Sequence, residues 1–113
     1  MKAVQISDYG GRENLALSDV DVPTPREGEA LVQLDYAGIN FIDVYMRQGD
    51  YRNSSTYGTP LPFTLGMEGA GTIVDPNGAK GISIGNRVAY CLSRGSYAEY
   101  ASVPAWKLVN IPA

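Results

Sequence analysis

The sequence predicts a mainly β protein, a partly open β-barrel with one or two short helices. Its 13 glycines and 7 prolines divide the 113 residues into short segments, as turns do in all-β domains. Several of these segments alternate apolar and polar residues with a period of two, which is typical of strands with one buried face. A single segment, from Phe41 onward, shows helical spacing instead.

The first half of the chain contains three predicted strands, over residues 1–6, 15–22 and 30–37, with turns at 8–11 and 26–29. The second strand alternates imperfectly and ends at the Pro-Thr-Pro segment of residues 23–25. In the third strand, Val32, Leu34 and Tyr36 recur at every second position, so they share one face.

A short helix is predicted to begin at Phe41 and to end near Gly49. Phe41, Val44 and Tyr45 recur at i, i+3 and i+4, which places them on one helical face. Asn40 precedes the helix and is a residue type that caps helix amino termini well. Gly49 suits the position just after a helix ends, where glycine is common.

Residues 50–64 are predicted to form the longest irregular segment and the wall of a cleft, because they are rich in Tyr, Ser, Thr and Pro. Beyond this loop we expect strands over 69–74, 87–91, 96–103 and 107–111, a turn at 75–78 and one helical turn at 104–106. The chain contains no internal repeat, and its length favours one domain over residues 1–113.

The charge distribution argues against nucleic acid and membrane partners. The chain has 9 basic and 12 acidic residues, a net charge of −3, and the charges are scattered along it. No apolar run approaches the roughly 20 residues that a membrane-spanning helix needs. The segment from Met1 to Ile6 lacks the apolar core of a secretory signal, so we expect a cytoplasmic protein.

The chain contains no histidine and one cysteine, Cys91. The absence of histidine excludes Ser-His-Asp and Cys-His nucleophile pairs, and the usual zinc sites, built within these 113 residues. A single cysteine excludes a disulfide within the chain. Its place at the end of an apolar strand predicts a buried, unreactive thiol.

Four segments carry a resemblance to a known family, namely residues 38–51, 62–71, 85–89 and 95–100. They resemble the amino-terminal, GroES-like domain of the quinone oxidoreductases, the zeta-crystallin branch of the medium-chain dehydrogenase/reductase superfamily. The resemblance implies a GroES-like barrel and hydride transfer from NADPH to a quinone or an enone. It also implies that a Rossmann domain absent from this chain holds most of the NADPH, so that the chain is a fragment without activity of its own.

The same resemblance places Asn40 and Met67 where zinc alcohol dehydrogenases of the superfamily carry a cysteine and a histidine ligand. Neither an amide nor a thioether replaces a thiolate or an imidazole on Zn²⁺, so we expect no zinc. Without a Lewis acid to ionise an alcohol, reduction of an electrophilic acceptor is the more natural reaction. The protein then positions donor against acceptor and stabilises negative charge on oxygen.

The resemblance also implies a set of site residues at the start of the helix and in the loop that follows. The implied catalytic residues are Asn40 and Tyr51, and the implied cofactor-binding residues are Asn40, Phe41, Ile42, Asp43 and Tyr45. Other interpretations stay open. Asn40 and Asp43 could form a capping box. Tyr45 could belong to the core, and Tyr51 could be an exposed loop residue.

The glycine-rich segment from Gly66 to Gly71 is not expected to bind a dinucleotide. Its Gly-x-x-Gly-x-Gly order reverses the Rossmann fingerprint and leads into a strand. Two other functions stay open, a stand-alone binding module on the same barrel and a co-chaperonin of the GroES type. For a fragment we expect a homodimer or self-association through the open cleft surface around Tyr45, Met46 and Tyr51.

Overall fold

The computed structural model describes residues 1–112, which form two antiparallel sheets, one α-helix and two 3₁₀ helices. The smaller sheet has the order β2-β1-β4 and consists of β1 (Lys2–Ile6), β2 (Ala16–Asp19) and β4 (Phe63–Thr64). The larger sheet has the order β7-β3-β5-β6-β8 and consists of β3 (Glu29–Ala37), β5 (Glu68–Asp75), β6 (Arg87–Cys91), β7 (Tyr100–Pro104) and β8 (Val109–Asn110). The helices are α1 (Phe41–Gln48), η1 (Arg12–Asn14) and η2 (Ala105–Lys107). The predicted mainly β fold is confirmed, and the two sheets do not close into one barrel.

Residues 96–99 connect the two sheets rather than extending β7. Ala98 forms an isolated bridge with Ala3 of β1, and the Tyr97 carbonyl accepts the N–H of Val4 at 2.8 Å. The prediction of a strand over 96–103 is therefore wrong in its first half. The strand begins only at Tyr100, because the backbone at Tyr97 and Ala98 pairs with β1, and Glu99 bonds to both β1 and β3.

The predicted loop 50–64 also ends in a strand. Phe63 and Thr64 form β4 and pair with Ile6 and Gln5 of β1. Two residues are too few to show an alternating pattern, so only pairing in three dimensions reveals this strand.

The hydrophobic core has two clusters, one within the larger sheet and one between the smaller sheet and α1. The first contains Ala30, Val32, Ile73, Val88, Tyr90, Ala101 and Val103. The second contains Ile6, Met46, Phe63, Leu65 and Met67. The side chain of Met46 is 1% exposed, and burying a side chain of this size is worth about 1.5–3 kcal/mol. Met46 therefore fixes α1 against the smaller sheet.

The buried face of α1 is the one that carries Asp43 and Met46. Ile42 also packs against the second cluster. Phe41 is 78% exposed and Tyr45 is 44% exposed, whereas Met46 is 1% exposed. Of the two interpretations left open for Tyr45, the core position is therefore wrong, and so is the expected place of Met46 on an open surface. The helix has two neighbouring apolar faces, one with Ile42 and Met46 and one with Phe41 and Tyr45. Because Met46 packs in the second cluster, the first of these faces is buried.

Two glycines of the Gly66–Gly71 segment are required by backbone packing. Gly66 has φ of +95°, and a side chain there would meet Ser96 and Tyr97. A Cβ on Gly71 would overlap the carbonyl oxygen of Gln33 in the neighbouring strand β3. The segment therefore lets chains pack closely at the start of β5, and it does not form a strand-to-helix turn of the dinucleotide-binding kind.

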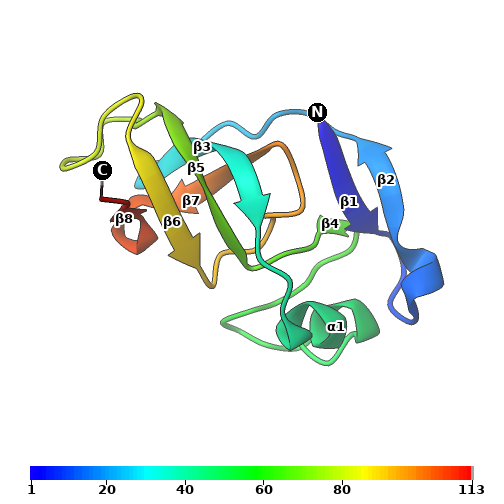
Figure 1. Cartoon of the computed structure of the whole chain (residues 1–113). Coiled ribbons are helices and arrows are strands. Elements are labelled where there is room, and N and C mark those ends of the chain that lie inside the picture. Colours follow the sequence, from blue (N-terminus) through cyan, green and yellow to red (C-terminus); the bar gives the residue numbers. More distant parts are fainter. Residues whose placement is uncertain (113) are drawn as a thin grey trace.

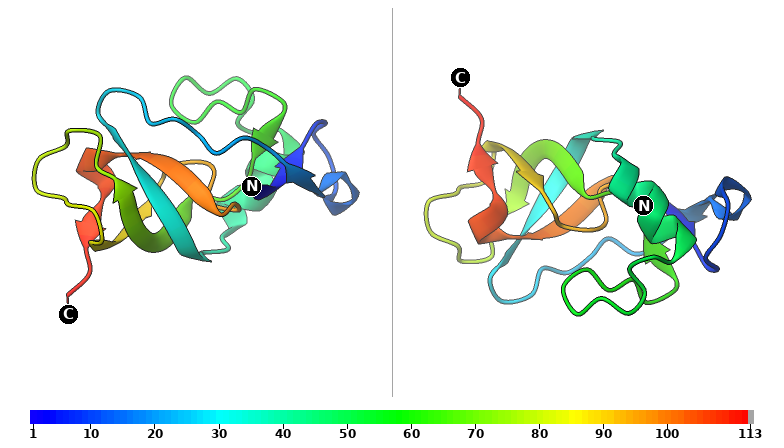
Figure 2. Two further views of the ribbon diagram at one scale, coloured as in Figure 1. Left: turned by 90° about the horizontal axis from the view of Figure 1, so that it is seen from above. Right: turned by 90° about the horizontal axis from the view of Figure 1, so that it is seen from below.

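The helix α1 lies beside the edge of the larger sheet at which β3 ends, β5 begins and β6 ends (Figure 1). The register places Ala37 opposite Gly69, and Glu68 opposite Cys91, at this edge. Figure 2 shows the larger sheet at one end of an elongated molecule of 39 × 27 × 25 Å, with β1, β2 and α1 at the other. Among residues 1–112, no helix is long and apolar enough to cross a bilayer.

Candidate functional site

A cavity of about 370 Å³ opens at this edge of the larger sheet. Its lining residues are Asn40, Ile42, Met67, Glu68, Cys91 and Leu92. They come from the start of α1, from the start of β5 and from the end of β6. Asn40 and Met67, which are 27 residues apart in the sequence, therefore meet in one cavity because β3 and β6 both pair with β5.

Asn40 has two roles in the geometry of this cavity. It forms a capping box with Asp43, in which the Asp43 carboxylate accepts the backbone N–H of Asn40 at 3.0 Å. The side-chain amide nitrogen of Asn40 also donates to the Glu68 carboxylate at 3.4 Å. The capping interpretation is therefore confirmed. The same side chain faces the cavity, so the cap leaves room for a role in binding.

Asp43 supports the start of α1 from inside the protein. It is 5% exposed, and the Tyr97 hydroxyl donates to its Oδ2 atom at 2.6 Å. Its Oδ1 atom is buried without a hydrogen-bond partner among the described residues. Burial, then the hydrogen bond to Asp43 and the charge of that carboxylate, raise the pKa of Tyr97 well above its ordinary value. Tyr97 therefore holds its proton at neutral pH.

The other expected site residues surround the cavity without all lining it. Ile42 lines it, whereas Phe41 and Tyr45 lie outside it on the exposed side of α1. Together with Ile39, which is 85% exposed, they form an open apolar surface next to the cavity. Tyr51 is half-buried against the second cluster, with its ring 6.3 Å from that of Tyr57 in an edge-to-face contact. The structure does not bring Tyr51 to the cavity wall.

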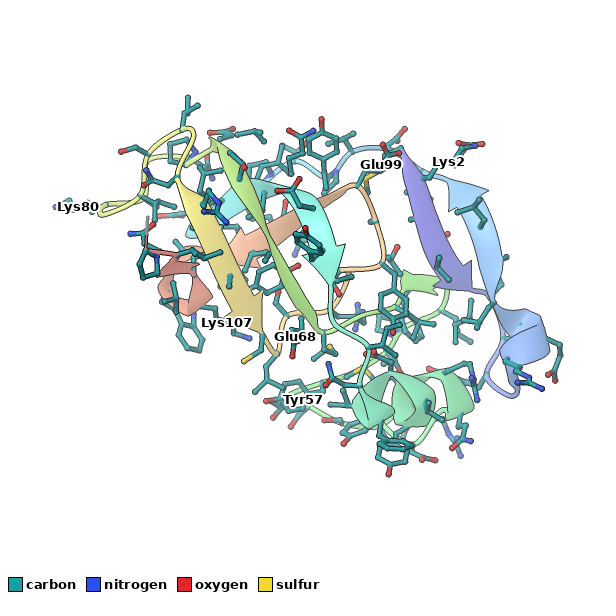
Figure 3. The ribbon with its side chains drawn as sticks, in the orientation of Figure 1. Lys2, Tyr57, Glu68, Lys80, Glu99 and Lys107 are labelled. Atoms are coloured by element: carbon teal, nitrogen blue, oxygen red, sulfur yellow. The ribbon has the colours of Figure 1, made fainter. Side chains whose placement is uncertain are left out.

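A second cavity of about 440 Å³ continues from the first and shares Met67 and Leu92 with it. Tyr57 and Trp106 are among its apolar wall residues, and Lys107 lines it as well. Figure 3 shows Tyr57, Glu68 and Lys107 on the side of the molecule that carries α1, the start of β5 and the end of β6. The two cavities form one groove, which we call the acceptor groove.

The sequence did not single out Leu92, Trp106 or Lys107. The Lys107 ammonium donates to the Leu92 carbonyl and lies 5.2 Å from the centre of the Trp106 ring. This contact joins η2 to the end of β6, two segments whose proximity depends on the pairing of β6 with β8. No local pattern in the sequence predicts this contact.

Cys91 is exposed and lines the acceptor groove, so the prediction of a buried thiol is wrong. Val88 and Tyr90 are the buried residues of β6, and the alternation of a strand turns Cys91 outward. The alternation of buried and exposed positions could have predicted an exposed Cys91 from the sequence. It was difficult to recognise because most residues of this strand are apolar.

The residues around Asn40 do not fit a zinc ion. Cys91 and Glu68 could each supply one ligand atom, but Asn40 offers an amide and Met67 a thioether. Tetrahedral zinc sites use thiolates, imidazoles and carboxylates almost exclusively. No group of three or more Cys, His, Asp or Glu side chains in the described part of the chain could hold a metal ion.

Residues 26–113 match the alcohol dehydrogenase GroES-like domain family. The chain belongs to this family. The match covers the whole larger sheet and α1, which together build the acceptor groove.

Three relatives illustrate the likeness. The quinone oxidoreductase of Pongo abelii is 35% identical over 99% of this chain. The crystal structure of the Escherichia coli quinone oxidoreductase complexed with NADPH superposes with a TM-score of 0.88 at 33% identity, over 99% of this chain and 33% of that one. The crystal structure of a 2-haloacrylate reductase superposes with a TM-score of 0.82 at 28% identity, over 99% of this chain and 32% of that one. The chain spans about a third of the length of the curated relatives it matches, 34% for the Pongo abelii protein.

Proposed function

We propose that this chain is the acceptor-binding domain of an NADPH-dependent quinone oxidoreductase that reduces quinones or activated alkenes without zinc. The observation that carries the proposal is the meeting of Asn40 and Met67 in one cavity. These are the two positions at which zinc-dependent relatives are expected to hold their metal. The cavity is lined by an amide, a thioether, a thiol, a carboxylate and two apolar side chains, which suits an electrophile held by hydrogen bonds and apolar contacts better than a metal-bound alcohol.

The nicotinamide ring of NADPH would lie against the start of α1, and NADPH supplies the hydride when it is bound. Ile42 and the exposed ring of Tyr45 offer apolar contacts there, and the Asn40 amide offers a hydrogen bond. Among the described residues, β3 leads directly into the helix α1, but the connecting residues 38–40 are Gly-Ile-Asn and lack the Gly-x-Gly-x-x-Gly order of a pyrophosphate-binding turn. A Rossmann domain outside these residues would therefore provide most of the cofactor's binding energy.

This chain's own residues would orient the acceptor and stabilise the negative charge that develops on its oxygen. Asn40 lines the cavity, where one amide N–H donates to the Glu68 carboxylate and the other would meet the acceptor oxygen, and the amino terminus of α1 adds a favourable dipole for negative charge. Ile42, Met67 and Leu92 exclude water from the acceptor. Tyr51 would require a movement of its loop to donate a proton, because the cavity wall does not include it.

The proposal can be tested in a chimera in which this chain replaces the matching third of the Escherichia coli enzyme. We expect NADPH oxidation with 1,4-benzoquinone, a loss of turnover on Asn40→Ala, and the same loss on Asn40→Ser, which restores the helix cap. NADPH binding by the chimera, followed by fluorescence, reports whether it has folded. A chimera that binds NADPH but reduces no quinone or enone would contradict the proposal and favour a binding module.

The chain by itself should not bind NADPH with micromolar affinity. A cytoplasmic location and self-association are also part of this proposal. The exposed apolar residues Ile39, Phe41 and Tyr45 support the self-association.

A further inference from the structure

Besides Lys107, the acceptor groove contains a second positive charge, Arg94, which the proposed function does not use. Arg94 and Ser102 both line the larger of the two cavities, the one that shares Met67 and Leu92 with the Asn40 cavity. The groove therefore contains an amide in one cavity and a guanidinium in the other.

Arg94 is held in place without being neutralised. Its Nη1 atom donates to the Gly58 carbonyl, and its guanidinium carbon lies 5.1 Å from the centre of the Phe63 ring. A guanidinium has five N–H donors, and this hydrogen bond uses one of them. The one ion pair among residues 1–112 is between Lys2 and Asp19. Arg94 therefore has no carboxylate partner among these residues.

The environment of Arg94 disfavours its charge. The side chain is half-buried, and this burial lowers the pKa of Arg94 below its ordinary value, with a smaller opposing effect from nearby Tyr9. Partly burying a cation without a counter-ion costs free energy. An anion at this position would offset that cost, and the planar fork of the guanidinium suits a carboxylate.

Ser102 of β7 belongs to the wall of the same cavity, but its hydroxyl does not reach the interior. Its Oγ atom is buried and has no hydrogen-bond partner among the described residues. A buried hydroxyl without a partner costs about 1–3 kcal/mol. Because this oxygen is closed off from the groove, an anion in the groove would meet Arg94 and not Ser102.

The other charged residues of the cavity are already engaged. Lys107 donates to the Leu92 carbonyl and adds positive charge to the groove. Glu29 is the carboxylate that lines this cavity, and its Oε1 atom accepts the backbone N–H of Arg26 at 3.0 Å.

We propose that the electron acceptor carries an anionic group, a carboxylate in the simplest case, that Arg94 holds while its electrophilic end faces Asn40. This inference rests on the proposed function and names the substrate class of the same groove. A third cavity of about 340 Å³ lies on the other side of Arg94 and Ser102. It shares no lining residue with the Asn40 cavity, so an anion bound there could not be the acceptor.

The anion site can be tested on this chain with benzoate and its neutral isostere benzamide. The readouts are the fluorescence of Trp106, the chain's single tryptophan, and the NMR signals of the Trp106 and Arg94 side-chain N–H groups. We expect saturable binding of benzoate that shifts both signals and weakens with salt, and at least ten-fold weaker binding of benzamide. Arg94→Gln should weaken benzoate binding about ten-fold. Arg87→Gln, at an exposed position of β6, should not.

Three results would overturn the proposal: equal binding of benzoate and benzamide, unchanged benzoate binding by Arg94→Gln, or a shift of the Arg94 signal without a shift of Trp106. The last result would place the anion in the third cavity. If Arg94→Gln does not fold, Arg94→Lys keeps the charge but loses the fork, and we expect it to bind benzoate with intermediate affinity. Full benzoate affinity in Arg94→Lys would then contradict the proposed carboxylate contact.

The chimera separates this inference from the proposed function. Monomethyl fumarate and dimethyl fumarate are activated alkenes that differ by one charge and one methyl group. We expect kcat/KM at least ten-fold higher for the monomethyl ester, and Arg94→Gln should remove this preference. Equal turnover of both esters would leave the reductase function standing and overturn the anion site. Benzoate binding without turnover of either ester would leave the anion site standing and contradict the reductase function.

Discussion

The hydrogen bond between Tyr97 and Asp43 should make a large contribution to stability, and Tyr97→Phe tests it directly. The substitution removes the hydroxyl that donates at 2.6 Å to a carboxylate that is 5% exposed. The other carboxylate oxygen already lacks a partner, so the charge would keep only the N–H of Asn40. A hydrogen bond to a charged group contributes about 1.5–3 kcal/mol, and we expect the free energy of unfolding to fall by that amount.

The assay is urea unfolding followed by circular dichroism, with Tyr36→Phe as the matched control. Tyr36 is 77% exposed, so losing its hydroxyl should change stability by less than about 0.5 kcal/mol. If Tyr97→Phe costs no more than Tyr36→Phe, the reasoning about the buried pair is wrong.

The pH dependence provides a second check on the same pair. The folded-state pKa of Tyr97 is raised above the unfolded value of 10.0. Its contribution is therefore fully present below about pH 10 and is lost as the pH rises through the folded-state pKa. The stability difference between the wild type and Tyr97→Phe should shrink above pH 10. A constant difference up to the alkaline unfolding limit would contradict this assignment.

Four further predictions concern the cap, the core, the metal and the exposed surface. Asn40→Ala should lower the free energy of unfolding by about 1 kcal/mol and Asn40→Ser by much less, measured by urea unfolding. Tyr90→Phe should leave stability unchanged or raise it, because it removes a buried hydroxyl that has no partner among the described residues; a loss above 1 kcal/mol would reveal a partner. Elemental analysis of dialysed protein should find less than about a tenth of a zinc ion per chain, because the residues around Asn40 do not form a zinc ligand set. Tyr45→Asp should reduce any dimer seen by sedimentation, whereas Leu17→Asp, at an exposed position of β2, should not.

The sequence by itself determined the class of fold and the character of the site. Short alternating segments between glycines and prolines predicted strands close to β1, β3, β5 and β6, because a period of two is a local property of the chain. Asn40, Gly49 and the limits of α1 were likewise predictable, since helix caps are local. The lack of histidine was decisive for the chemistry, because it limits which ligands any fold of this chain could assemble.

Only the tertiary structure decided which residues share the acceptor groove. Asn40 and Met67 meet because β3, β5 and β6 pair in one sheet, and Trp106 and Lys107 join them through the pairing of β8 with β6. The outward position of Tyr45 and the burial of Asp43 follow from how Met46 docks on the smaller sheet. Arg94 gains its importance in the proposal from the lack of a carboxylate partner among residues 1–112. A sequence records which groups a residue carries, but only packing shows which of those groups remain unsatisfied.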